Sequence, residues 1–247
     1  MLKVLAMGVG AALTLLLAYV ILKVGLALYS SQKSVAQVSP ISTKPANPAA
    51  SLLVLGDSTA VGTGAGRAEK SLVGRISSSF PSVAIENRAV VGAVADDLDM
   101  QLGSAERSSY DVLLIAIGGN DVLRFTAMSS LRETLAGILE QSATRADHRA
   151  IIVPGMVGDA PAVPWPVSLL YNARSESLRQ LVDELASTSG VQFVDLHRDA
   201  AMRAAFAENP QANYAADGLH PSGEGYALWY EVLSTQLPLQ RWFQAPR

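Results

Sequence analysis

The chain has 247 residues, of which 49% are hydrophobic and 17% are charged, and its formal net charge is -3. Phosphate binding requires a basic patch, so this small negative charge, without a Lys/Arg cluster, argues against a nucleic-acid partner. The sequence contains no cysteine, which excludes thiol catalysis, zinc–thiolate sites and disulfides.

Residues 1–29 are predicted to form a membrane anchor. The run from Val4 to Leu22 holds nineteen uncharged residues between Lys3 and Lys23. As a helix it would be about 28 Å long, close to the roughly 30 Å hydrocarbon core of a bilayer. A cleaved signal peptide, whose apolar region is usually shorter, is the alternative and would make the protein secreted. We favour a transmembrane helix that leaves the following domain extracytoplasmic, on the periplasmic side.

Residues 30–50 are rich in serine and proline and are predicted to be an extended linker. From residue 51 onward, short apolar runs alternate with helical patterns. The runs predict strands at 52–55, 83–85, 112–117, 151–153 and 191–194, and the patterns between them predict helices around 72–76, 94–102, 131–139 and 170–185, with a last helix over 223–235. The third helix is expected to begin with a capping box at Ser130, and the fourth to end before Gly190. This alternation predicts a parallel sheet with helices on both faces.

Four polar motifs stand where loops leave the carboxyl edge of that sheet, which is where ligands bind in such folds. They are Gly56-Asp57-Ser58, a segment containing Asn87 and Gly92, Gly118-Gly119-Asn120-Asp121, and Asp217-Gly218-Leu219-His220-Pro221.

These residue types suit acyl transfer. A serine hydroxyl becomes a good nucleophile when an imidazole accepts its proton, and a carboxylate fixes the tautomer of that imidazole. We predict Ser58 as the nucleophile, His220 as the base and Asp217 as the residue that orients His220. The oxyanion would be bound by the backbone N–H groups of Ser58 and Gly92 and by the side-chain amide of Asn120.

In this order the four motifs resemble those of the SGNH (GDSL) hydrolases, over about residues 51 to 236. The second motif is essentially one glycine, Gly92, supported by the upstream Asn87. The resemblance implies a flavodoxin-like three-layer α/β/α fold with a five-stranded parallel sheet, and ester hydrolysis through Ser58, His220 and Asp217. Members of that family act on lipids, thioesters, acylated sugars and small esters, so the resemblance does not choose the substrate.

Other polar residues near these motifs are predicted to have structural roles. Asp57 is expected to hold its turn by side-chain hydrogen bonds, and Asp121 to be structural as well. His148 lies in a polar segment, 145–149, predicted to be a solvated turn.

His197, which follows strand five close to Asp195, is the alternative histidine for Ser58. We prefer Asp217 and His220, because their loop matches a whole motif and leads directly into a helix.

No cofactor or metal is predicted. Gly62, Gly64 and Gly66 are each two positions apart, and this spacing matches neither a P-loop nor a dinucleotide-binding fingerprint. No cluster of histidines and carboxylates has the spacing of metal ligands.

The segment 154–166 contains four prolines and two glycines and is predicted to be a loop over the site. Met156, Val157 and Trp165 would form an apolar wall, with Trp165 lining an acyl pocket; a tryptophan packed back into the core is the alternative.

We therefore interpret residues 51–247 as a domain of a serine ester hydrolase with esterase, lipase or lysophospholipase-like activity on a small-molecule ester or a lipid. One alternative is an O-acyltransferase that passes the acyl group to a sugar or glycan hydroxyl with the same three residues. The other is an anchored binding module that has lost turnover. The sequence leaves the substrate and the oligomeric state open.

Overall fold

The computed structural model describes residues 10–11, 14–16, 18–20, 22–23, 38–155 and 157–244. Most of the predicted anchor, 1–29, and the first part of the predicted linker lie outside these residues. Within the described part of the chain, no helix is both long enough and apolar enough to cross a membrane.

A five-stranded parallel sheet forms the centre of the domain, as the apolar runs predicted. Its strands lie in the order β2-β1-β3-β4-β5 and are β1 (Ala50–Gly56), β2 (Val83–Asn87), β3 (Tyr110–Ala116), β4 (Ala146–Val153) and β5 (Gln192–Asp195). The strand order reverses between β1 and β3, because the chain goes from β1 to β2 on one side and then continues from β3 on the other. The loops after β1 and β3 therefore lead to opposite sides of the sheet and leave a crevice at its carboxyl edge.

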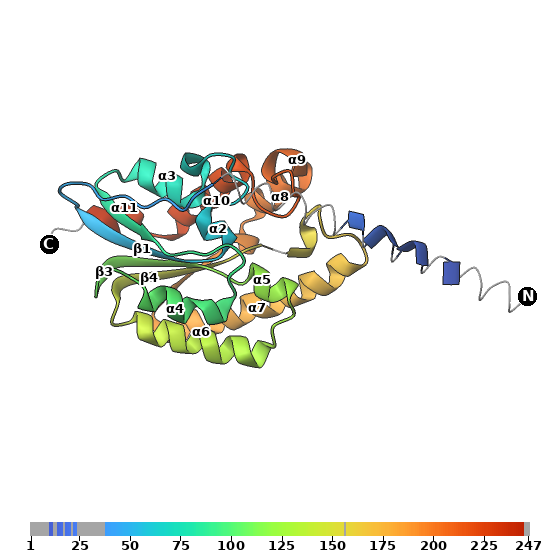
Figure 1. Cartoon of the computed structure of the whole chain (residues 1–247), viewed down its shortest axis with the longest axis horizontal. Coiled ribbons are helices and arrows are strands. Elements are labelled where there is room, and N and C mark those ends of the chain that lie inside the picture. Colours follow the sequence, from blue (N-terminus) through green and yellow to red (C-terminus); the bar gives the residue numbers. More distant parts are fainter. Residues whose placement is uncertain are drawn as a thin grey trace, which may run out of the picture.

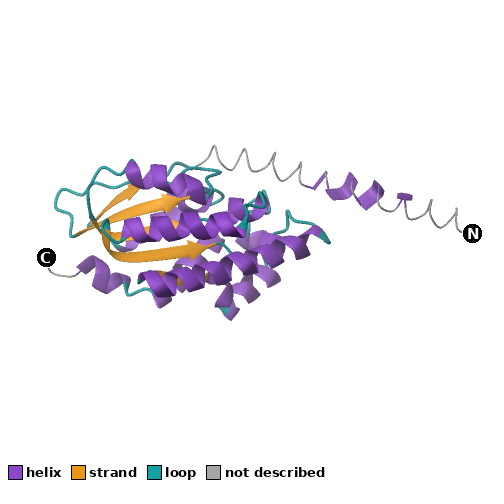
Figure 2. Cartoon of the chain, turned by 90° about the horizontal axis from the view of Figure 1, so that it is seen from below, coloured by secondary structure: helices purple, strands orange, loops and turns teal. Residues whose placement is uncertain are grey.

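Helices cover both faces of the sheet, which gives the predicted three layers (Figure 1). One layer contains α3 (Leu72–Ser79), α10 (Gly223–Gln236) and α11 (Leu239–Gln244), and the other contains α4 (Leu98–Gly103), α6 (Met128–Ser142) and α7 (Val167–Ser189). Figure 2, turned by 90°, shows helices running nearly along the strands. Alternate residues of β1 belong to two separate apolar clusters, Leu52 and Val54 to one and Leu53 and Leu55 to the other. This is the period-2 pattern of a strand buried on both faces.

Short helices gather in the loops between the main elements. They are α2 (Ser58–Val61), α5 (Gly119–Leu123), α8 (Ala200–Glu208) and α9 (Pro210–Asn213), with the 3₁₀ turns η1 (Ala68–Lys70), η2 (Ala95–Asp97), η3 (Val157–Asp159) and η4 (Leu196–Arg198). The helices α2 and α5 follow β1 and β3 at the carboxyl edge and carry Ser58 and Asn120, whereas the fourth polar motif lies in the loop between α9 and α10.

Two local predictions were wrong. The helix α6 begins at Met128 without a side-chain cap, so Ser130 lies inside its first turn and forms no capping box. The segment around His148 is not a turn, because β4 begins at Ala146 and pairs with β3, with His148 opposite Val112. The His148 ring is half-buried and stacks on Trp242 of α11, with ring centroids 5.0 Å apart.

Other boundaries were predicted correctly. The helix α7 ends at Ser189, and Gly190 follows in the left-handed conformation with φ 67°. Such a residue terminates a helix at no steric cost when it is glycine.

The described part of the predicted linker packs on the domain. Thr43 forms an antiparallel bridge with Ile85 of β2, and the hydroxyl of Ser42 accepts a hydrogen bond from the Asn87 N–H. Val38 is buried. The folded unit therefore includes residues 38–49, ahead of β1.

Candidate active site

The turn after β1 places Ser58 at the first position of α2. Gly56 has φ 144°, and a Cβ there would lie 2.0 Å from the carbonyl oxygen of Ala116, so only glycine allows β1 and β3 to approach this closely. Asp57 caps α2 by accepting hydrogen bonds from the N–H and the hydroxyl of Thr59, at 2.8 and 2.7 Å. The structural role predicted for Asp57 is confirmed. Burial raises the pKa of this carboxyl, although the bonds from Thr59 partly offset that effect.

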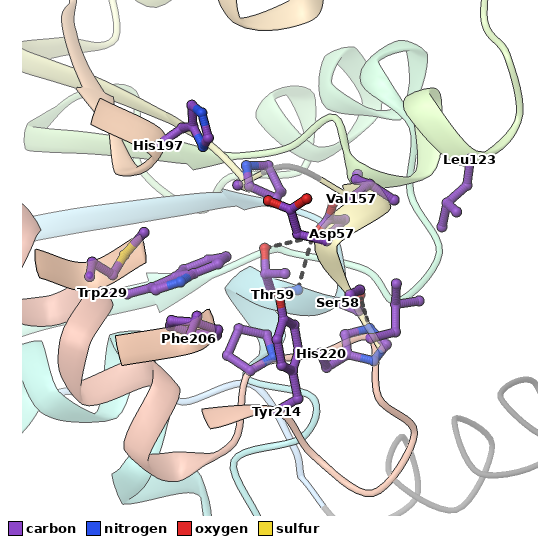
Figure 3. A pocket seen from close by; sticks show the side chains of 18 of the residues that line it. Asp57, Ser58, Thr59, Leu123, Val157, His197, Phe206, Tyr214, His220 and Trp229 are labelled. Carbon is purple, nitrogen blue, oxygen red and sulfur yellow. Dashed lines mark hydrogen bonds between the residues drawn. The ribbon is translucent and has the colours of Figure 1, made fainter. Parts of the chain in front are cut away.

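Ser58, His220 and Asp217 form a hydrogen-bonded line, of which Figure 3 shows Ser58 and His220. Ser58 Oγ lies 2.8 Å from His220 Nε2, and His220 Nδ1 lies 2.7 Å from Asp217 Oδ2. The other carboxylate oxygen, Oδ1, accepts the backbone N–H groups of Leu219 and His220 at 2.9 and 3.0 Å. Burial alone would raise the pKa of Asp217, but the hydrogen bonds from His220 and from these backbone groups lower it below its ordinary value. Asp217 is therefore ionised at neutral pH and favours the tautomer that keeps a proton on Nδ1.

The two other expected oxyanion donors come from the loops after β2 and β3. The Asn120 amide donates to the carbonyl of Ala93 at 3.0 Å, which orients this side chain and leaves its second N–H available. Gly92 has φ 81°, a conformation that favours glycine, and its carbonyl accepts a hydrogen bond from Arg124. Asn120 lines the same cavity as Ser58, whereas Gly92 is not among the residues that line it.

Asn87 and Asp121 hold these loops in place. The Asn87 amide donates to the carbonyl of Ala60 in α2, and its oxygen accepts the Ala89 N–H, so it ties the turn after β2 to the helix that begins at Ser58. Asp121 is fully buried and accepts the N–H of Ala95 at 3.0 Å. The structural role predicted for Asp121 is confirmed, and burial raises the pKa of its carboxyl.

His197 does not take the place of His220. Asp195, its expected partner, forms an ion pair with Arg179 at 2.8 Å and accepts the backbone N–H of His197 rather than its ring. His197 nevertheless lines the cavity, on the wall formed by η4.

A cavity of about 380 Å³ opens beside Ser58. It extends from His220 past Thr59 to the buried side chains of Met202 and Trp229 (Figure 3). Its apolar lining residues are Leu123, Pro154, Val157, Ala160, Met202, Phe206, Ala207, Leu219, Pro221 and Trp229, and Tyr214 stands among them with a ring perpendicular to that of Phe206. Burial, with a contribution from Asp159, raises the pKa of the Tyr214 phenol to about 12, so it remains neutral.

The wall formed by α8 was not predicted from the sequence. Met202 and Phe206 are four residues apart and so lie on one face of that helix. This spacing was the only local signal, and it does not distinguish a cavity wall from an ordinary core helix. Phe206 reaches the site because Gly225 of α10 has no side chain; a Cβ there would lie 3.0 Å from the Phe206 ring and 2.2 Å from the carbonyl oxygen of Asn213.

The loop after β4 contributes to the cavity, but not through the predicted tryptophan. Val157 and Ala160 line it, and Met156 lies outside the described residues. Trp165 is 70% exposed, so it neither lines the cavity nor packs into the core. Gly158 packs closely against the carbonyl of Ser168 in α7, and Val157 and Gly158 are buried, whereas Trp165 at the end of the loop is exposed.

Comparison with known proteins points to one family. The model of the GDSL-like lipase/acylhydrolase family matches residues 54–228. A GDSL-like esterase of Mycobacterium tuberculosis is 27% identical over 192 residues, which are 74% of this chain and 60% of that protein. The chain therefore spans about 60% of the length of this curated relative.

Solved structures share the fold. An acetylxylan esterase from Geobacillus stearothermophilus has a TM-score of 0.58 and 20% identity, over 81% of this chain and 99% of that one. An extracellular lipase from Streptomyces rimosus has a TM-score of 0.56 and 18% identity, over 76% of this chain and 99% of that one. A lipolytic G-D-S-L protein from Veillonella parvula has a TM-score of 0.57 and 17% identity, over 75% and 96%.

Proposed function

The chain belongs to the GDSL-like lipase/acylhydrolase family, and from this membership and the geometry around Ser58 we propose that the protein is a serine ester hydrolase. The observation that carries the proposal is the line of hydrogen bonds, at 2.8 and 2.7 Å, that joins Ser58, His220 and Asp217. This is the arrangement that activates a serine hydroxyl for attack on an acyl carbon.

In the proposed mechanism, Ser58 Oγ attacks the ester carbonyl while His220 Nε2 takes its proton. The negative charge of Asp217 stabilises the imidazolium that forms. His220 then gives the proton to the leaving alcohol, and a water molecule, activated in the same way, hydrolyses the acyl-enzyme. The backbone N–H groups of Ser58 and Gly92 and the amide of Asn120 would bind the oxyanion, each such donor contributing about 2.7 to 4 kcal/mol.

The cavity beyond Thr59 is proposed to hold the acyl group. It is lined there by Met202, Phe206 and Trp229, with Arg203 beside Met202 also in its wall, and has a volume of about 380 Å³. An acetyl group would leave most of it empty. Each additional methylene buried there is expected to contribute about 0.8 kcal/mol until the cavity is filled, so we expect esters of longer acyl chains to be preferred over acetate.

A series of p-nitrophenyl esters from acetate to palmitate tests both proposals. Ser58→Ala should abolish hydrolysis. Ser177→Ala, an exposed serine on α7, is the matched control and should leave it unchanged. A rate maximum at acetate would contradict the acyl-binding cavity. If the folded wild type hydrolysed none of the esters, the acyltransferase and binding-module alternatives would replace the hydrolase.

We also propose that residues 1–29 anchor the protein in a membrane, with the domain on the extracytoplasmic side. The support is the uncharged run from Val4 to Leu22. Protease added to intact spheroplasts should degrade the domain. Protection of the domain until the cells are lysed would contradict the proposed location.

A further inference from the structure

Exposed apolar side chains gather around the entrance to the cavity. Within residues 38–155 and 157–244, seven large apolar side chains are exposed, and six of them lie in the loops after β2 and β3 or between β4 and the first turn of α7. We call these six the apolar rim: Val90, Val91, Phe125, Trp165, Leu169 and Leu170, which are between 38% and 70% exposed. Single exposed apolar residues are common, but a contiguous group of them marks an interaction surface.

One half of the rim is joined through the loops after β1, β2 and β3. The N–H of Val90 donates to the carbonyl of Gly56 at the end of β1. The Arg124 guanidinium donates to the carbonyl of Gly92, which links the Val90 loop to the loop that contains Phe125. The valines and the phenylalanine therefore lie on one connected surface beside the site.

The other half continues from Phe125 to the start of α7. The Phe125 ring lies 5.3 Å from the ring of Tyr171 and 4.9 Å from the Arg174 guanidinium. Leu170 lies four residues before Arg174 and so shares its face of α7, whereas Leu169 and Trp165 lie in the first turn of α7 and just before it. Figure 1 shows the start of α7 at the same end of the molecule as α5 and α8. The rim thus extends from Phe125 to the start of α7.

Phe125 adopts φ 57°, in the left-handed region, and it is the only described residue other than glycine with a positive φ. This conformation is unfavourable for a bulky residue and is typical of functional sites. Here it accompanies an aromatic side chain that is 44% exposed beside the entrance.

The chain enters the domain at this same edge. Val38 is buried and packs near Gly62, just after α2, and Ser42 pairs with Asn87 at the carboxyl end of β2. Fifteen residues, 23–37, connect Leu22, the end of the apolar run, to Val38. Such a connection spans at most about 58 Å when extended, so Val38 stays within that distance of whatever surface holds the apolar run.

We propose that the apolar rim docks on the surface of a lipid bilayer with the entrance of the cavity facing the lipid. None of the rim residues is charged, so the contact rests on burial of apolar area at the interface and does not require anionic lipid. Docking itself does not depend on the proposed function. Its consequence, that ester substrates pass from the bilayer to Ser58 without crossing water, rests on the proposed function.

The first test uses fluorescence of the full chain reconstituted in phosphatidylcholine vesicles. Two of the three tryptophans, Trp229 and Trp242, are buried, whereas Trp165 is exposed on the rim. Phosphatidylcholine with brominated acyl chains should quench part of the emission, and Trp165→Phe should remove the quenched part. Equal fractional quenching of the two proteins would overturn the proposal, whether or not the protein hydrolyses esters.

The second test compares two esters, p-nitrophenyl acetate in water and p-nitrophenyl palmitate in the vesicles. Leu169→Glu combined with Leu170→Glu should lower hydrolysis of the vesicle-borne ester by about tenfold and leave the soluble ester unchanged, because charge on the rim weakens its burial in lipid. The matched control is Met100→Glu on α4, which is 65% exposed but away from the rim, and it should leave both rates unchanged.

The outcomes separate the docking surface from the enzyme. Rates equal to wild type on both esters in the double variant would overturn the docking surface. If the wild-type protein hydrolysed neither ester, the proposed function would be contradicted. The quenching measurement would still show whether the rim docks on the bilayer. The alternative is that the rim joins two copies of this chain. In that case the double variant would have a lower mass by light scattering than the wild type, and the fluorescence of Trp165 would not be quenched. This result would also overturn the proposal.

Discussion

Replacing Asp217 by asparagine tests the proposed roles of the three hydrogen-bonded residues most directly. The side-chain oxygen of the asparagine can keep the hydrogen bonds that Asp217 Oδ1 accepts from the N–H groups of Leu219 and His220. The amide nitrogen then faces His220 Nδ1, which must become an acceptor. The proton moves to Nε2, where it points at Ser58 and prevents His220 from acting as a base. Rotating the amide to avoid this would sacrifice two backbone hydrogen bonds, each worth about 1 kcal/mol, and bring three donors together.

The size of the effect follows from the distance. A carboxylate and an imidazolium 2.7 Å apart attract each other by about 6 kcal/mol at an effective dielectric constant of about 20. At 1.36 kcal/mol for each factor of ten, loss of this stabilisation lowers kcat/KM by roughly 10⁴. The control is Asp147→Asn, at an exposed position of β4, which should keep full activity.

The assay is hydrolysis of the best p-nitrophenyl ester by the wild type and both variants, with circular dichroism to show that each is folded. An Asp217→Asn variant within tenfold of the wild type would refute the reasoning, because the carboxylate would then neither set the tautomer nor stabilise the imidazolium.

The same carboxylate links stability to pH. The pKa of Asp217 is lower in the folded state than in the unfolded chain, so the ionised group stabilises the fold above its unfolded pKa, about 3.9, and that contribution is lost as the pH falls through the folded pKa. Urea denaturation should therefore show the wild type more stable than Asp217→Asn at pH 7, with a difference that shrinks as the pH falls below about 4. A constant difference would contradict the assigned direction.

Three further variants test the positions around the site. Asn120→Ala should lower kcat by about 10² to 10³ with little change in KM if the amide binds the oxyanion, and a change in KM alone would refute that role. Gly225→Ala should destabilise the protein by about 2 kcal/mol, because the new Cβ would lie 2.2 Å from the carbonyl oxygen of Asn213. Gly137→Ala, in the middle of α6 with open space around it, is the control and should raise the melting temperature slightly. Asp57→Ala should lower the free energy of unfolding, measured by urea denaturation, by about 2 kcal/mol, because it removes the cap of α2. Asp57→Asn keeps an acceptor oxygen without a buried charge and should lower it by less than about 0.5 kcal/mol. Equal losses in the two variants would show that the charge itself is needed.

Features of the chain that depend on neighbours in sequence were predicted correctly. The five strands lie where apolar runs occur, because a parallel strand buried on both faces must be apolar along its length. The turn at Asp57 and the end of α7 before Gly190 follow from hydrogen bonds and backbone angles within a few residues. The error at His148 arose because β4 pairs with the distant strand β3, and the error at Ser130 arose because α6 begins two residues earlier, at Met128.

The sequence by itself therefore determined the class of fold and the residues able to carry the chemistry, since strand periodicity and motifs at strand ends are local properties. Only the tertiary structure decided which of these residues meet. Ser58 and His220 are 162 residues apart and are brought to 2.8 Å by the strand order and by α10 packing on the sheet. It also decided that Met202 and Phe206 line the cavity while Trp165 points to solvent. Which side chains meet and which are exposed depends on how whole helices and strands pack against one another, and this packing cannot be predicted from a stretch of a few residues.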